Sequence, residues 1–229
     1  MKFRKRVVLF GLEDVLVPGK VEQKLPMEKV YALLQQLKSL EEKDSKFHMV
    51  LVTGCSEKEA LKKIGEFKLN EYFRPENIHF VNQRYIESKE IVDQELYLKR
   101  VKENPSFKDE YFKQTIIQSC EKQFSCGKEG MVFIGHDVWT EGYYTMLFSG
   151  IDFVLIRSAH SHLDEKMAQE LSCITYIDRD WKDVKKVIEG KIVPSKELGC
   201  LTKYAQKKLS EELFKGTQLE GLAKLSNAK

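Results

Sequence analysis

Short apolar runs recur along this chain, and segments with a helical pattern lie between them. Each run is four residues long. Runs that are apolar rather than alternating with polar residues are typical of strands whose two faces are both covered. We therefore predict buried strands at residues 7–10, 49–52, 78–81, 131–134, 153–156 and 174–177.

The segments between these runs carry the period of an amphipathic helix. Five apolar residues within 30–40 recur at spacings of three and four residues, which places them on one helix face. After the second run, Ser56 and Glu59 form a capping box that marks a helix start. The alternation predicts an α/β fold of three layers, Rossmann-like, with a parallel sheet between helices. A ligand should then bind beyond the C-terminal ends of the strands.

The length of 229 residues fits one main domain with small additions. We expect the α/β domain to cover residues 1–195, with a small helical insertion at about 83–105. Residues 196–229 are expected to form a C-terminal helix and tail. We favour packing of this helix on the α/β domain, and the alternative is that it binds a protein partner.

Composition argues for a cytoplasmic protein without a membrane segment. The longest apolar run near the N-terminus, residues 7–12, is far shorter than the roughly 20 residues that span a bilayer. Five cysteines without a C-x-x-C pair favour a reducing compartment. The net charge of +3 is too small to indicate a nucleic-acid partner.

Polar residues follow three of the predicted strands. The first is followed by residues 11–16, which include Glu13 and Asp14, and the second by Thr53 and Gly54. The fourth is followed by Gly135, His136 and Asp137, with Glu141 a turn later. A hydroxyl and backbone amides at a helix start are suited to phosphate. Acids at the other two strand ends are suited to Mg²⁺, which prefers oxygen ligands.

Three of these segments resemble the motifs of the haloacid dehalogenase-like (HAD) phosphohydrolase superfamily. VVLFGLEDVLVPG resembles the first motif, VLVTGCS the second, and MVFIGHDVWTEGYYTMLFSGIDFVLI the fourth. The resemblance implies the HAD variant of the three-layer fold over residues 7–156 and a phosphatase-like site. In that family, the first Asp of motif one attacks phosphorus and the second acts as general acid and base.

The chain departs from those motifs at the reacting positions. Gly11 stands at the nucleophile position, Glu13 at the acid–base position, and His136 at the first acid of the fourth motif. Because glycine has no side chain, no aspartyl-phosphate can form at Gly11. The same change removes a carboxylate ligand, so Mg²⁺ binding is expected to be weakened, although Asp137 and Glu141 remain as metal candidates.

The third motif of the family is a lysine before the fourth strand. Lys102, Lys108 and Lys113 lie in this region, and we favour Lys108. With Thr53 and Gly54 it would complete a phosphate cradle.

Three functions are compatible with this pattern. The preferred one is a HAD-like protein without aspartyl-phosphate phosphatase activity that binds a small phosphorylated ligand or a protein partner. The alternative is a divergent metal-dependent phosphohydrolase that uses Glu13 or Asp14 with Asp137, and with His136 and Glu141 on a metal such as Mn²⁺ or Zn²⁺. The third is a scaffold with a vestigial crevice.

The gap from Val17 to Met27 is too short to hold a cap domain. The crevice should therefore be open. An open crevice is compatible with a bulky ligand or with a homodimer in which another subunit covers it.

Overall fold

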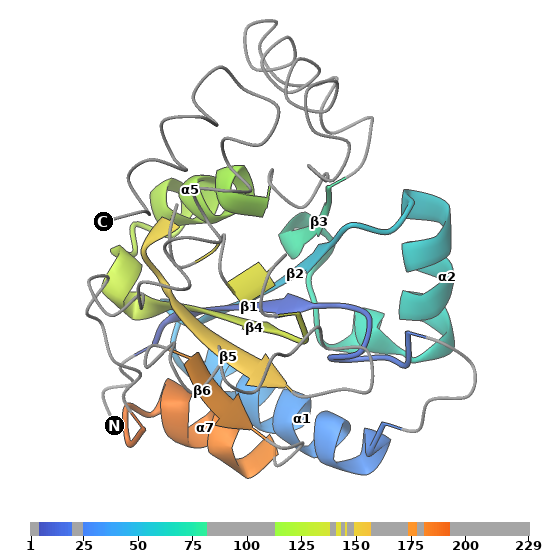
Figure 1. Cartoon of the computed structure of the whole chain (residues 1–229), viewed down its shortest axis with the longest axis horizontal. Coiled ribbons are helices and arrows are strands. Elements are labelled where there is room, and N and C mark those ends of the chain that lie inside the picture. The colour runs from blue at the N-terminus through green and yellow to red at the C-terminus, as the bar shows by residue number, and fades with distance from the viewer. Residues whose placement is uncertain are drawn as a thin grey trace, which may run out of the picture.

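A parallel sheet of six strands lies at the centre of the computed structural model of this chain, as Figure 1 shows. The structure describes residues 5–19, 25–81, 113–137, 141–142, 145, 149–156, 174–177 and 181–192. The elements are β1 Val7–Gly11, α1 Met27–Lys43, β2 His48–Thr53, α2 Glu57–Glu66, η1 Leu69–Glu71, η2 Pro75–Asn77, β3 Ile78–Phe80, α5 Lys113–Gln123, η4 Lys128–Gly130, β4 Met131–Gly135, β5 Asp152–Ile156, β6 Ile174–Ile177 and α7 Trp181–Ile188.

The strands are ordered β3-β2-β1-β4-β5-β6, and all neighbouring pairs are parallel. The chain moves outward from β1 to β3 and then crosses to β4 on the other side of β1. This reversal of strand order lies between β1 and β4, where open α/β sheets bind ligands beyond the carboxyl ends of their strands. The topology therefore places the ends of β1 and β4 at the expected ligand site.

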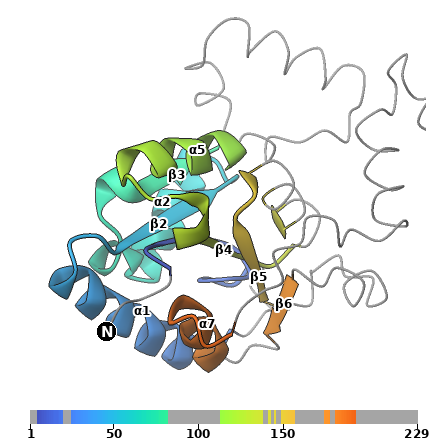
Figure 2. The ribbon, with the colours of Figure 1, turned by 90° about the vertical axis from the view of Figure 1, so that its left-hand side faces the viewer.

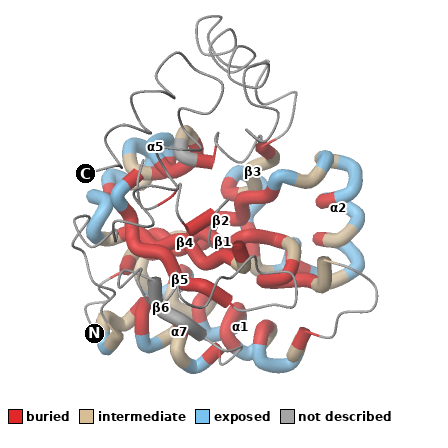
Figure 3. Tube along the Cα trace, viewed as in Figure 1, coloured by how far each residue is buried: buried red, intermediate tan, exposed pale blue. Residues whose placement is uncertain are grey.

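Side chains that alternate along the strands build two cores, one on each face of the sheet. In β1, Val8 and Phe10 pack with residues of α1, α2 and α7, whereas Val7 and Leu9 pack with residues of α5. Figure 2 shows α1 and α7 on one side of the sheet and α5 on the other. The strands in the middle of the sheet are buried throughout (Figure 3). These two cores confirm the predicted three-layer α/β fold.

The predicted strands and the helix start agree closely with the structure. Each of the six apolar runs overlaps a strand. Helix α2 begins at Glu57 with Ser56 as its N-cap, and the Ser56 hydroxyl oxygen accepts a hydrogen bond from the Glu59 N–H. The expected insertion at 83–105, Lys108 and the segment 196–229 lie outside the described residues. Within the described ranges, no helix combines the length and apolar character needed to cross a membrane.

Candidate functional site

The segments that follow β1, β2 and β4 meet at the carboxyl edge of the sheet. They bring Glu13 and Asp14 after β1, Thr53 and Gly54 at the end of β2, and the residues after β4 to one region. β1 is hydrogen-bonded to both β2 and β4, so its loop lies between the other two. The strand pairing thus places the three clusters at one edge of the sheet, and the crevice that the sequence predicts between them stays a prediction.

Glu141 is the most connected side chain of the crevice. Its Oε1 lies 3.0 Å from Lys113 Nζ, and its Oε2 accepts the backbone N–H groups of His136 at 2.7 Å and Asp137 at 3.2 Å. The Nδ1 atom of His136 lies 3.3 Å from the same Oε2. The Glu141 side chain is 3% exposed. Its carboxylate is therefore enclosed by donors that belong to the protein itself.

Two glycines make room for this carboxylate. A Cβ atom placed on Gly11 would lie 2.9 Å from Glu141 Oε1 and 3.3 Å from a methyl group of Val15. A Cβ atom on Gly135 would lie 2.4 Å from Glu141 Oε2. Both separations are below ordinary contact, so the Glu141 side chain fills the space beside Gly11 and Gly135. The space beside Gly11 is thus filled by a carboxylate from another loop.

Lys113 is the lysine that pairs with Glu141. It is the first residue of α5, its side chain is 8% exposed, and it joins this helix to the end of β4 through Glu141. The Phe133 ring lies beneath it, 6.0 Å from Nζ to the ring centroid. Lys113 was one of the three lysines considered from the sequence, and the favoured Lys108 lies outside the described residues.

Burial and neighbouring charge act in opposite directions on Glu141 and His136. Burial raises the pKa of Glu141, but the charges of Lys113 and His136 lower it by more, so this pKa lies well below its ordinary value. Burial lowers the pKa of His136, but Glu141, Asp14 and Asp137 raise it by more. The crevice therefore favours an ionised Glu141 beside a charged imidazole.

Asp14 is held in a tight turn after β1. It adopts a left-handed backbone conformation with φ of 58°, which Asp tolerates better than most residues. Its backbone N–H donates to the Val17 carbonyl, and its Oδ1 accepts the Gly19 N–H at 3.0 Å. Its Oδ2 faces His136 Nε2 at 3.9 Å. One oxygen of the Asp14 carboxylate therefore stabilises the turn, and the other faces the His136 imidazole.

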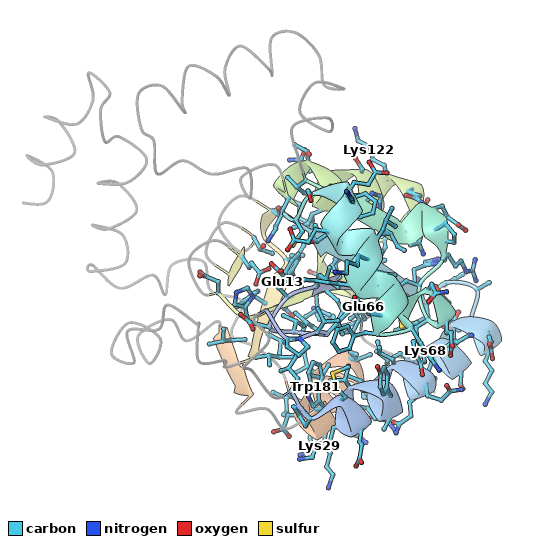
Figure 4. All side chains as sticks on the ribbon, turned by 90° about the vertical axis from the view of Figure 1, so that its right-hand side faces the viewer. Glu13, Lys29, Glu66, Lys68, Lys122 and Trp181 are labelled. Atoms are coloured by element: carbon cyan, nitrogen blue, oxygen red, sulfur yellow. The ribbon has the colours of Figure 1, made fainter. Side chains whose placement is uncertain are left out.

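Glu13 lies beside α2, as Figure 4 shows. Its Oε1 forms an ion pair with Lys63 Nζ, and the same Nζ lies 3.5 Å from Glu59 Oε1. Burial raises the pKa of Glu13, but the hydrogen bonds from Lys63 and Cys55 lower it by more. The sequence did not identify Lys63 as a site residue, because its spacing from Glu59 already explains it as part of a surface ion pair.

Thr53 and Gly54 lie at the carboxyl end of β2. Thr53 is buried, and its Oγ1 accepts the Cys55 N–H at 3.0 Å. Gly54 is exposed. A second hydrogen bond joins the Thr53 hydroxyl to the side chain of Cys55.

The crevice carboxylates do not fit a divalent metal. Both oxygens of Glu141 already face nitrogen donors, and one Asp14 oxygen accepts a backbone N–H. The ring of His136 stands between the remaining Asp14 oxygen and Glu141. Among the described residues, no group of three or more His, Cys, Asp and Glu side chains is arranged to hold a metal ion.

Comparison with known proteins found similarity to solved structures. No protein-family model and no curated protein matches this sequence. A haloacid dehalogenase-like family hydrolase from Xanthomonas campestris has 10% identity and a TM-score of 0.48, covering 83% of this chain and 98% of its own. A haloacid dehalogenase-like hydrolase protein from Bacillus subtilis has 14% identity and a TM-score of 0.48, covering 84% and 91%. An uncharacterized protein from Listeria monocytogenes serotype 4b has 14% identity and a TM-score of 0.45, covering 81% and 99%.

Proposed function

We propose that this chain is a HAD-like protein without aspartyl-phosphate phosphatase activity, and that it acts by binding a small phosphorylated ligand. The observation that carries the proposal is the closed nucleophile position. Gly11 supplies no carboxylate, and the Glu141 carboxylate occupies the adjacent space. The Glu141 side chain is buried and both of its oxygens accept from protein donors, Oε1 from Lys113 and Oε2 from two backbone N–H groups, so neither oxygen is exposed for in-line attack on phosphorus.

The acids of the β1 loop do not replace the missing nucleophile. A general base needs a pKa near the working pH, but the pKa of Glu13 is lowered by its bonds to Lys63 and Cys55. Asp14 accepts the Gly19 N–H and faces His136. The geometry therefore gives no support to a hydrolase that activates water through Glu13 or Asp14.

A phosphate group is the ligand for which the described residues are best suited. Thr53 offers a hydroxyl, Gly54 offers exposed backbone, and α2 begins just beyond them. Helix starts and small hydroxyl residues favour anions. The segment expected to bind a protein partner, 196–229, lies outside the described residues.

A turnover assay tests the catalytic part of the proposal. With para-nitrophenyl phosphate and Mg²⁺, the wild-type chain is expected to release no more product than a protein-free control. A matched variant combines Gly11→Asp, His136→Asp and Glu141→Asp, which adds a nucleophile and shortens the acid that blocks it. Turnover by this variant alone would support a silenced site, whereas robust wild-type turnover would contradict the proposal.

A binding assay tests the ligand part. Inorganic phosphate is expected to raise the thermal unfolding temperature of the wild type, and Thr53→Val is expected to reduce that rise, because the valine keeps the volume and removes the hydroxyl. Potassium chloride at matched ionic strength is the control. An equal shift with both salts, or an unchanged response in Thr53→Val, would contradict phosphate binding at this loop.

A further inference from the structure

The imidazole of His136 lies between two carboxylates that come from different loops. Its Nε2 atom is 3.9 Å from Asp14 Oδ2, and its Nδ1 atom is 3.3 Å from Glu141 Oε2. Asp14 follows β1 and Glu141 follows β4, so the ring spans the two sides of the switch point. The His136 side chain is 22% exposed, while the two carboxylates are 6% and 3% exposed. The ring is therefore placed where two buried negative charges face each other.

Carboxylates buried this deeply need a cation close by, because ionised groups removed from water are costly unless paired. Lys113 meets this need on the Oε1 side of Glu141. It contacts a different oxygen from the one that faces His136. The space between Asp14 and Glu141 is occupied by the ring instead.

From this geometry we infer that the His136 side chain takes the place of a divalent cation in the crevice, which makes the site complete without metal. The inference deepens the proposed non-catalytic function and rests on it. It accounts for two features together: His136 stands where the fourth motif has an acid, and the carboxylates around it face nitrogen donors. Mg²⁺ would need oxygen ligands at about 2.0–2.1 Å in near-octahedral geometry. The ring and a metal ion cannot both occupy this space.

Thermal unfolding of the full chain with and without metal tests the inference. Wild type, His136→Asp and His136→Gln are compared in EDTA and in millimolar MgCl₂ or MnCl₂. The wild type is expected to show no metal-dependent change in unfolding temperature. His136→Asp is expected to be less stable in EDTA and to gain about 3 °C or more with metal, since binding to the native state stabilises it. His136→Gln, which adds no carboxylate, is expected to gain less.

His48→Gln is the matched control. His48 also lies 3.9 Å from a carboxylate oxygen, that of Glu41, but it stands at the opposite end of the sheet, at the start of β2. No metal response is expected from this variant. Its unfolding temperature therefore separates a general effect of losing a histidine from one specific to the crevice.

A metal-dependent rise in the wild type would overturn the inference, as would the absence of any metal response in a folded His136→Asp. If that variant does not fold, Mn²⁺ binding to the wild type is measured instead, through the loss of the paramagnetic resonance signal of the free ion. No bound ion supports the inference, and one bound ion per chain overturns it. Metal binding without phosphate ester turnover would defeat this inference alone and leave the proposed function standing.

Discussion

The Glu141 carboxylate lies against Gly11, with Oε1 at 2.9 Å from the point at which a Cβ atom on that glycine would stand. Gly11, at the end of β1, has no side chain, and Glu141, from the loop after β4, fills the space beside it. The two positions are therefore coupled, and a change at either one affects the other.

Glycine substitutions test the packing directly. Gly11→Ala is expected to destabilise the protein by about 1–3 kcal/mol, because the new methyl group meets the Glu141 carboxylate. Gly135→Ala is expected to cost more, since its Cβ atom would lie only 2.4 Å from Glu141 Oε2. Urea denaturation of the two variants measures both effects.

Gly65→Ala is the control for these glycines. Gly65 lies within α2 with nothing within 4 Å of the added carbon, so alanine should stabilise the protein by about 0.5–1 kcal/mol. Adding Glu141→Asp to Gly11→Ala should recover part of the lost stability. A neutral Gly11→Ala would show that Glu141 does not fill this space.

The Lys113–Glu141 pair is expected to contribute strongly to folding. Lys113→Met leaves a buried carboxylate without its ammonium partner, which costs about 3–5 kcal/mol in comparable buried pairs. Lys62→Met removes an exposed partner of Glu66 and should cost less than about 1 kcal/mol. Chemical unfolding compares the two. Equal effects would mean that the crevice pair is no more important than a surface pair.

Glu13 gives a pH-dependent prediction. Its folded pKa is lowered mainly through Lys63 after burial has raised it, so the stability that it contributes is present above its ordinary pKa and is lost as the pH falls through the folded pKa. The wild type should therefore unfold at a higher temperature than Glu13→Gln at pH 7, and the difference should shrink toward pH 3. A difference that grows on acidification would show that folding raises the pKa of Glu13 instead of lowering it.

Cys55 is expected to react slowly with alkylating agents. Burial raises the pKa of its thiol to about 11, so only about one thiol in a thousand is ionised at pH 8. Peptide mass spectrometry after iodoacetamide treatment should show little modification of Cys55 in the native protein and full modification in guanidinium. Rapid native labelling would indicate that the β2 loop opens in solution.

The sheet was predictable because its strands are buried on both faces, and this produces apolar runs that periodicity can identify. Ser56 likewise marked the start of α2. The residues after the strands were also identified, since parallel strands place their carboxyl ends at one edge. The contacts among them were not predictable: nothing in the sequence shows that Lys113 pairs with Glu141 or that Lys63 pairs with Glu13. Such pairs depend on how α5 and α2 pack on the sheet, and this is decided by tertiary contacts.

We predict that no carboxylate in the described loops after β1 and β4 becomes phosphorylated. The most direct test incubates the wild-type protein with a small acyl phosphate and Mg²⁺, quenches in acid, and measures the intact mass. The mass of the wild type should stay unchanged, because Gly11 offers no oxygen and the Glu141 carboxylate is buried with donors on both of its oxygens. A base-labile mass increase of one phosphoryl group, located by peptide mapping to the β1 or β4 loop, would contradict the account.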